Sequence, residues 1–124
     1  MRGISPGRKQ DSFRFRREEH LKGRNEIREV FGHGRRFGCQ GAKLFVLKNS
    51  LSCNRICFTF SRGFGNAVQR NRARRLGREA YRLLRPGLLG GYDLILLIHP
   101  ETKSALSIRS KQLEFLFTKA GLLK

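Results

Sequence analysis

Acidic residues are scarce in this chain. Its 124 residues include 27 Lys and Arg but only nine Asp and Glu, which gives a formal net charge of +18. A metal site for phosphoryl chemistry needs several carboxylates close together, and nine acids spread along the chain do not supply such a cluster. The sequence also lacks a Ser-His-Asp arrangement and a phosphate loop ending in Lys-Ser/Thr. We therefore expect neither a catalytic centre nor a metal site in the protein itself.

Cysteines and long apolar runs are also few. Cys39, Cys53 and Cys57 show neither Cys-x-x-Cys spacing nor a His-x3-His partner, so a closed zinc site is not expected. No stretch approaches the ~20 apolar residues of a membrane span. The first six residues lack the apolar run of a signal peptide. These absences favour a cytoplasmic protein that has no membrane partner.

The basic excess consists mostly of arginine. Self-repulsion at this net charge destabilises a compact chain unless a polyanion neutralises it. An anionic membrane is one candidate, but a membrane-surface helix needs large apolar residues opposite its charges. The arginine-rich segment described below mostly has small ones there. Because guanidinium groups bind phosphate through two parallel hydrogen bonds and stack on bases, the composition favours nucleic acid.

The length fits a single domain. Residues 1–17 combine Gly, Pro and Ser with basic residues, and we predict a flexible basic arm there. Apolar spacing predicts a first helix from about Arg24 to His33, and the stretch 32–38 is expected to be a loop. Alternating patterns predict strands at 42–48 and 55–61, which pair most simply as an antiparallel hairpin.

The second half of the chain has stronger signals. Asn66 is a good cap for a helix that runs from Ala67 to about Arg85. A nearly continuous apolar run at 92–98 predicts a central strand covered on both faces. A last helix is expected over roughly 107–120. The order α-β-β-α-β-α predicts a small two-layer α/β sandwich.

The helix from Ala67 has two different faces at 100° per residue. The apolar side carries Ala73, Leu76, Gly77, Ala80, Leu83 and Leu84, and these mostly small residues suggest that the helix lies close to the sheet. The opposite side carries Arg70, Asn71, Arg74, Arg75, Arg78, Arg82 and Arg85. Like charges four residues apart each destabilise a helix by ~0.2–0.5 kcal/mol, and Glu79 alone offers relief. We therefore interpret this side as a phosphate-binding face. Gly63 and Gly65, just before the helix, fit either a tight turn or a close approach to an anion.

Residues 64–80, which read FGNAVQRNRARRLGREA, are more specific than charge alone. They resemble the signature of the bacterial ribonuclease P protein subunit, which is centred on Arg-Asn-Arg. The resemblance extends over about residues 20–120. It includes Leu21-Lys22, Ile27, Val30-Phe31 and His33-Gly34 around the first helix, Phe60-Ser61-Arg62 before the turn, and Tyr92-Asp93-Leu94-Ile95 after the long helix.

The resemblance implies a fold and a function. The fold is an α/β sandwich in which the arginine helix joins two parallel strands by a left-handed crossover, whereas pattern reasoning alone predicts a right-handed one. The function is that of an accessory subunit in the ribonucleoprotein that removes the 5′ leader from precursor tRNA. Residues 18–124 would form a single RNA-binding domain. The implied partners are the ribonuclease P RNA subunit, which holds the Mg²⁺ ions, and precursor tRNA. We expect a monomeric protein in a 1:1 complex with the RNA.

The resemblance also assigns site residues. The RNA-contacting positions are Arg62, Arg70, Asn71, Arg72, Arg74, Arg75, Arg78 and Arg82. The positions lining a cleft for the single-stranded leader are Ile27, Phe31, Phe45 and Thr59. Ile27 stands where the family usually has Phe, and Gly63 stands where a second basic residue often follows Arg62. From the residues alone, Phe31 and Phe45 fit core packing equally well.

Other functions fit parts of the sequence. A ribosomal or other structural RNA-binding protein would have a similar charge and size, but it would not need a leader cleft. A stand-alone nuclease would need more acidic residues. A DNA-binding helix-turn-helix would need two closely linked helices, which the pattern does not show.

Overall fold

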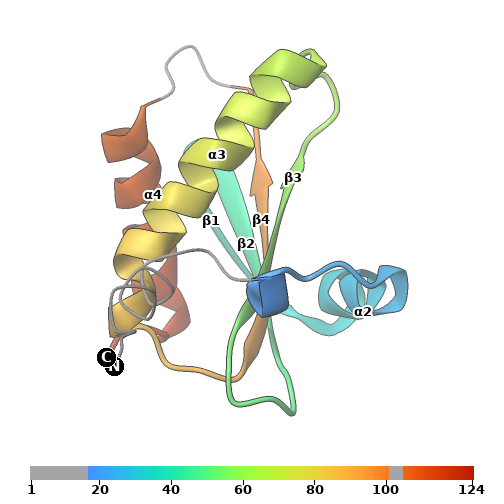
Figure 1. Cartoon of the computed structure of the whole chain (residues 1–124), viewed down its shortest axis with the longest axis vertical. Helices are drawn as coiled ribbons and strands as arrows, with labels where there is room; N and C mark the ends of the chain where they lie inside the picture. Colours follow the sequence, from blue (N-terminus) through green and yellow to red (C-terminus); the bar gives the residue numbers. More distant parts are fainter. Residues whose placement is uncertain (1–16, 101–104) are drawn as a thin grey trace, which may run out of the picture.

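The computed structural model describes residues 17–100 and 105–124, and the predicted basic arm therefore lies almost entirely outside the described residues. Four strands form one mixed sheet. Two helices, α3 and α4, cover one face of this sheet and α2 lies against the other (Figure 1). The elements are η1 (Arg17–Glu19), α2 (Arg24–His33), β1 (Arg35–Cys39), β2 (Ala42–Lys48), β3 (Arg55–Phe60), α3 (Ala67–Leu84), η2 (Arg85–Gly87), β4 (Tyr92–Ile98) and α4 (Leu106–Ala120). The predicted α/β sandwich is confirmed. None of the helices in these two ranges is long and apolar enough to cross a lipid bilayer.

The predicted hairpin between the strands at 42–48 and 55–61 is wrong. The strand order is β1-β2-β4-β3, so β4 lies between the two strands that were expected to pair. β4 runs antiparallel to β2 and parallel to β3. Leu94, Ile95 and Leu96 are fully buried, and a strand that is apolar on both faces needs neighbours on both edges. The central position predicted for this strand is thus confirmed, and it separates β2 from β3.

A strand also occupies part of the stretch that was predicted to be a loop. β1 pairs antiparallel with β2 through a two-residue turn at Gln40-Gly41, where Gly41 has a φ of 91°. Such turns favour glycine because they need a positive φ. Phe37 and Cys39 pack against the main core, while Arg35 and Arg36 are exposed. Two arginines on a short edge strand protect the sheet edge from further pairing. They also interrupt the alternation of apolar and polar residues by which a strand is predicted from sequence.

The connection from β3 through α3 to β4 has the left-handed sense that the family resemblance implies. Both strands point upward in Figure 1, and α3 crosses in front of the sheet between them. β4 lies to the left of β3 in this view (Figure 1). A right-handed crossover seen from the helix side would place the second strand to the right.

α3 packs very closely on the sheet. A Cβ atom built on Gly77 would lie 2.7 Å from the Phe58 ring, which confirms that the small residues allow a close approach. Ala73 and Ala80 are buried beside it, as predicted. The exposure of two side chains differs from the prediction. One of them is explained by packing of α3 against α4. Tyr81 is fully buried and contacts Phe117, whereas Leu83 is 53% exposed.

The residues before α2 extend the sheet beyond β3. The Leu21 amide donates a hydrogen bond to the Ile56 carbonyl at 3.0 Å, and the Leu21 side chain is buried. Glu19 is also buried, and its carboxylate accepts a hydrogen bond from Arg85 at 2.5 Å. This ion pair connects the N-terminal segment, which we define as residues 17–22, to the end of α3.

The packing of Gly77 gives a test of the fold. Replacing a helical glycine with alanine usually stabilises a protein by ~1 kcal/mol, but overpacking a core costs ~1–3 kcal/mol. We expect Gly77→Ala to lower the free energy of unfolding by up to ~2 kcal/mol, measured by urea denaturation. Phe58→Leu in the same chain should restore part of the loss.

Gly32→Ala is the matched control, because Gly32 is also helical and an added Cβ there meets nothing within 4 Å. It should raise stability by ~0.5–1 kcal/mol. If Gly77→Ala stabilised the protein as much as Gly32→Ala does, the proposed close packing on Phe58 would be wrong.

Candidate RNA interface

The start of α3 is fixed by a complete capping box. The Gln69 amide donates to the Asn66 side chain, and the Asn66 amide donates to the Gln69 side chain, both at 2.9 Å. Gly63 and Gly65 ahead of it have φ values of 80° and 146°. Backbone geometry of this kind requires glycine, so turn formation by itself accounts for both glycines. The Arg70 guanidinium donates to the Gly65 carbonyl and holds the turn against the helix.

The predicted RNA-contacting residues do not all face solvent equally. Arg62, Asn71, Arg72 and Arg75 are exposed, and Arg72 and Arg75 flank a shallow hollow of about 270 Å³ beside Leu76. The remaining predicted arginines are half-buried; these are Arg70, Arg74, Arg78 and Arg82. The exposed set lies on the first half of α3 and on the turn before it. We call Asn71, Arg72 and Arg75 the outward face of α3.

Contacts within the helix hold several of these side chains. Asn71 accepts a hydrogen bond from Arg74 at 2.9 Å, and the Arg74 guanidinium lies 5.1 Å from the centre of the Phe60 ring. Asn71 of the Arg-Asn-Arg element therefore orients Arg74, which lies three residues further along α3. Glu79 accepts hydrogen bonds from Arg82, which lower the pKa of the Glu79 carboxyl group and keep it ionised. Because this acid is paired with Arg82, it does little to offset the other arginines.

The predicted cleft residues come together on the face of the sheet that α2 covers, which we call the α2 face. Ile27 and Phe31 from α2 pack against Phe45 of β2 in the second apolar cluster. The Phe31 and Phe45 rings meet edge to face, with their centroids 4.8 Å apart. Thr59 joins them through the strand register, because Phe45, Ile95 and Cys57 form one row across the sheet and Lys43, Leu97 and Thr59 form the next.

Exposure differs sharply between the two aromatic residues. Phe45 is only 6% exposed, whereas Phe31 and Thr59 are half-buried. The Arg36 guanidinium also lies over Phe45, 5.8 Å from the ring centre. The sequence did not indicate Arg36 as a site residue, because the stretch 32–38 was expected to be a loop. In the structure, Arg36 of β1 pairs with Phe45 of β2, and both side chains therefore lie on the same face of the sheet. Phe31, rather than Phe45, is the more accessible aromatic residue.

Comparison with known proteins finds relatives of a single family. The family model for ribonuclease P matches residues 15–121. The ribonuclease P protein component of Natranaerobius thermophilus is 48% identical over 77 residues, which cover 62% of this chain and 67% of that protein. The corresponding protein of Clostridioides difficile is 35% identical over 92 residues, which cover 73% and 81%.

Solved structures show the same fold. The RNase P protein of Staphylococcus aureus superposes with a TM-score of 0.76 at 19% identity and covers 86% of this chain and 98% of its own. The RNase P protein of Thermotoga maritima superposes with a TM-score of 0.68 at 24% identity, covering 79% and 94%. Together with the family match, which spans most of the chain, these findings show that the chain belongs to the ribonuclease P protein family, the accessory protein subunits of the ribonucleoprotein that removes the 5′ leader of precursor tRNA.

Proposed function

We propose that the protein divides its contacts with RNA between two surfaces. The outward face of α3 binds the ribonuclease P RNA subunit, and the α2 face of the sheet binds the single-stranded leader of precursor tRNA. The two surfaces lie on opposite sides of the sheet, because α3 covers one face and the leader-binding residues lie on the other (Figure 1). One protein molecule bound to one RNA could therefore contact both at the same time.

The charge of α3 is the main support for the first assignment. Its outward face carries arginines whose mutual repulsion is relieved when phosphates bind and release counterions. Guanidinium groups at a fixed helical spacing suit a structured RNA, because its backbone phosphates also have fixed positions. The RNA subunit is structured, whereas the leader is single-stranded, so we assign this face to the RNA subunit.

The residue types on the α2 face support the second assignment. Single-stranded RNA is held by basic side chains that follow the backbone and by aromatic side chains on which bases stack. The half-buried Phe31 supplies an aromatic surface, while Arg36 and Lys43 supply positive charge on the same face. Thr59 adds a hydroxyl group that can bond to a base or a ribose.

Magnesium is assigned to the RNA. Within residues 17–100 and 105–124, no group of three or more His, Cys, Asp or Glu could hold a metal ion. The side chains in these two ranges therefore do not fit a Mg²⁺ site, and we assign the ions to the RNA subunit and its phosphates. The protein's contribution is to bind and position the two RNAs.

Leader binding can be tested at Phe31. In the holoenzyme, Phe31→Ala should weaken binding of precursor tRNA by ~1–3 kcal/mol and leave binding of mature tRNA unchanged, because only the precursor carries the leader. Ile27→Phe should keep or tighten precursor binding. Phe45→Ala should instead lower the melting temperature, since Phe45 is buried and removing a core Phe costs ~3–5 kcal/mol.

Phe115→Ala provides the matched control. Phe115 is 51% exposed on α4, and its removal should change neither affinity. Equal losses for precursor and mature tRNA in a Phe31→Ala protein with a normal melting temperature would mean that the leader is bound elsewhere.

Assembly with the RNA subunit can be tested on α3. Arg72→Ala combined with Arg75→Ala should weaken binding to the RNA subunit. It should also reduce the slope of log affinity against log salt by about one unit per lost phosphate contact. The control is Arg28→Ala with Lys111→Ala, which removes the same charge from exposed positions on α2 and α4. If both pairs gave the same slope, only net charge would matter and α3 would not be the binding surface.

The accessory role predicts that the protein has no nuclease activity. Rigorously RNA-free protein with Mg²⁺ should leave precursor tRNA intact, while addition of the protein to the RNA subunit at low Mg²⁺ should increase cleavage. A gel-based cleavage assay measures both. Leader removal by the protein alone would contradict the assignment of catalysis to the RNA.

A further inference from the structure

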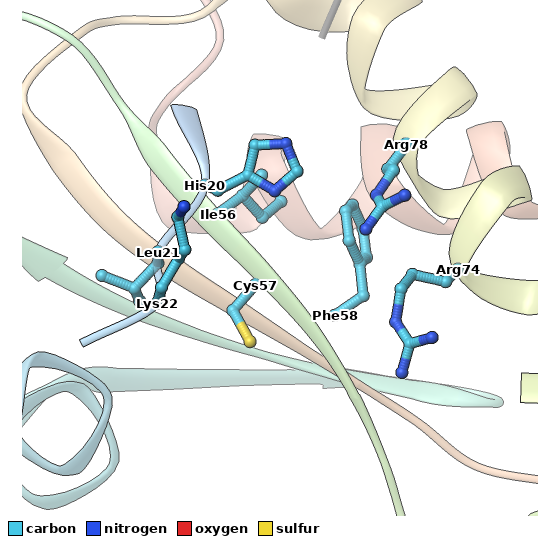
Figure 2. Close-up of a pocket in the computed structure, with 8 residues that line it drawn as sticks. All are labelled: His20, Leu21, Lys22, Ile56, Cys57, Phe58, Arg74 and Arg78. Carbon is cyan, nitrogen blue, oxygen red and sulfur yellow. The ribbon is translucent and has the colours of Figure 1, made fainter. Parts of the chain in front are cut away.

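A pocket of about 170 Å³ opens beside the outer edge of β3. Figure 2 shows the N-terminal segment on one side of it, α3 on the other, and β3 passing between them. Its lining combines basic and apolar side chains and includes no acid: His20, Leu21, Lys22, Ile56, Cys57, Phe58, Arg74 and Arg78. It adjoins the α2 face, because Leu21 and Cys57 also belong to the apolar cluster there, but none of the predicted leader-binding residues and none of the outward face of α3 lines it.

The N-terminal side of the pocket is held in place by buried contacts. Leu21 is 3% exposed and donates its amide to Ile56, which adds the segment to the edge of the sheet. The adjacent Glu19 is paired with Arg85 at the end of α3. In an extended segment, residues two apart point to the same side, so His20 and Lys22 can both line the pocket.

The helical side supplies two guanidinium groups. Arg74 and Arg78 are one turn apart, and Figure 2 shows both side chains reaching from α3 toward β3. Asn71 and the Phe60 ring orient Arg74. Like charges at this spacing repel each other, and the lining of the pocket contains no Asp or Glu.

The floor of the pocket adds no negative charge. Burial raises the pKa of the Cys57 thiol, although the nearby Arg74 partly lowers it, so the thiol stays neutral near pH 7. The outer edge of β3 lies next to it. Because the Ile56 carbonyl points outward to Leu21, strand alternation places the Phe58 amide on the same outer edge. Cationic side chains and a backbone donor thus line the pocket on both sides.

We infer that this pocket binds a backbone phosphate of RNA and thereby clamps the N-terminal segment to α3 in the assembled enzyme. The inference rests on the proposed function, because it takes RNA to be the ligand. It adds His20 and Lys22 to the contacts, and it gives Arg74 and Arg78 a shared phosphate in place of separate ones. The phosphate belongs either to the RNA subunit or to precursor tRNA, and both present the same phosphodiester chemistry.

The test compares Lys22→Gln with Lys111→Gln. Both replace an exposed lysine, but only Lys22 lines the pocket. Affinity for the RNA subunit alone and affinity of the holoenzyme for precursor tRNA are each measured across a salt series. We expect Lys22→Gln to reduce the salt slope by about 0.7–0.9 in one of these measurements, which identifies the RNA that supplies the phosphate. Lys111→Gln should match the unmodified protein in both, and melting temperatures should confirm that both variants fold.

A second measurement uses inorganic phosphate and needs no RNA. Cys57 lines the pocket, whereas Cys39 and Cys53 do not, so the rates at which iodoacetamide alkylates the three thiols can be compared within one sample. Phosphate should slow alkylation of Cys57 only, and Lys22→Gln should reduce this protection.

The outcomes separate this inference from the proposed function. If Lys22→Gln and Lys111→Gln give equal salt slopes with both RNAs, the phosphate pocket is overturned even though the protein still binds RNA. If the unmodified protein binds neither RNA, the proposed function fails instead. The alkylation of Cys57 then tests whether the pocket binds an anion. Selective protection of Cys57 by phosphate supports an anion site, and a lack of protection overturns the inference.

Discussion

The close packing of α3 on the sheet is the constraint on which the other features depend. Gly77 leaves no room for a methyl group in front of Phe58, and Ala73 and Ala80 are buried on the same side. Because this side of the helix must lie against the sheet, the arginines are confined to the remaining surface. One stripe of small residues therefore determines both how near the helix lies to the sheet and where its charges point.

Two of the described acids, Asp93 and Glu19, hold the fold together through ion pairs. Asp93 is buried and accepts two hydrogen bonds from Arg55, which raise the pKa of that arginine. Glu19 similarly holds Arg85. Breaking a buried pair by removing one partner leaves a charge that is costly to bury, so these acids stabilise the strand and helix ends that they join. They contribute little to neutralising the outward face of α3, and under the proposed function bound RNA supplies the compensating negative charge.

The sequence alone predicted the features that depend on local pattern. The bounds of α3, the central place of β4 and the reason for Gly77 all follow from periodicity and residue size, and the left-handed crossover came from the family resemblance. The position of β4 between β2 and β3 was not predicted, because strand pairing depends on competition between distant segments. Arg36 was missed with the strand that carries it. The pairing of Glu19 with Arg85 joins residues 66 positions apart, and no local pattern indicates it.

The central position of β4 determines when the sheet can form during synthesis. β4 is the last strand to leave the ribosome, yet β2 and β3 are joined into one sheet only through it. The hairpin of β1 and β2 can form early, because its contacts are local. β3 and α3 must wait, with their apolar surfaces uncovered, until residue 98 has emerged. The sheet is therefore completed in one late step, and this period of exposure is when the nascent chain is most prone to aggregate.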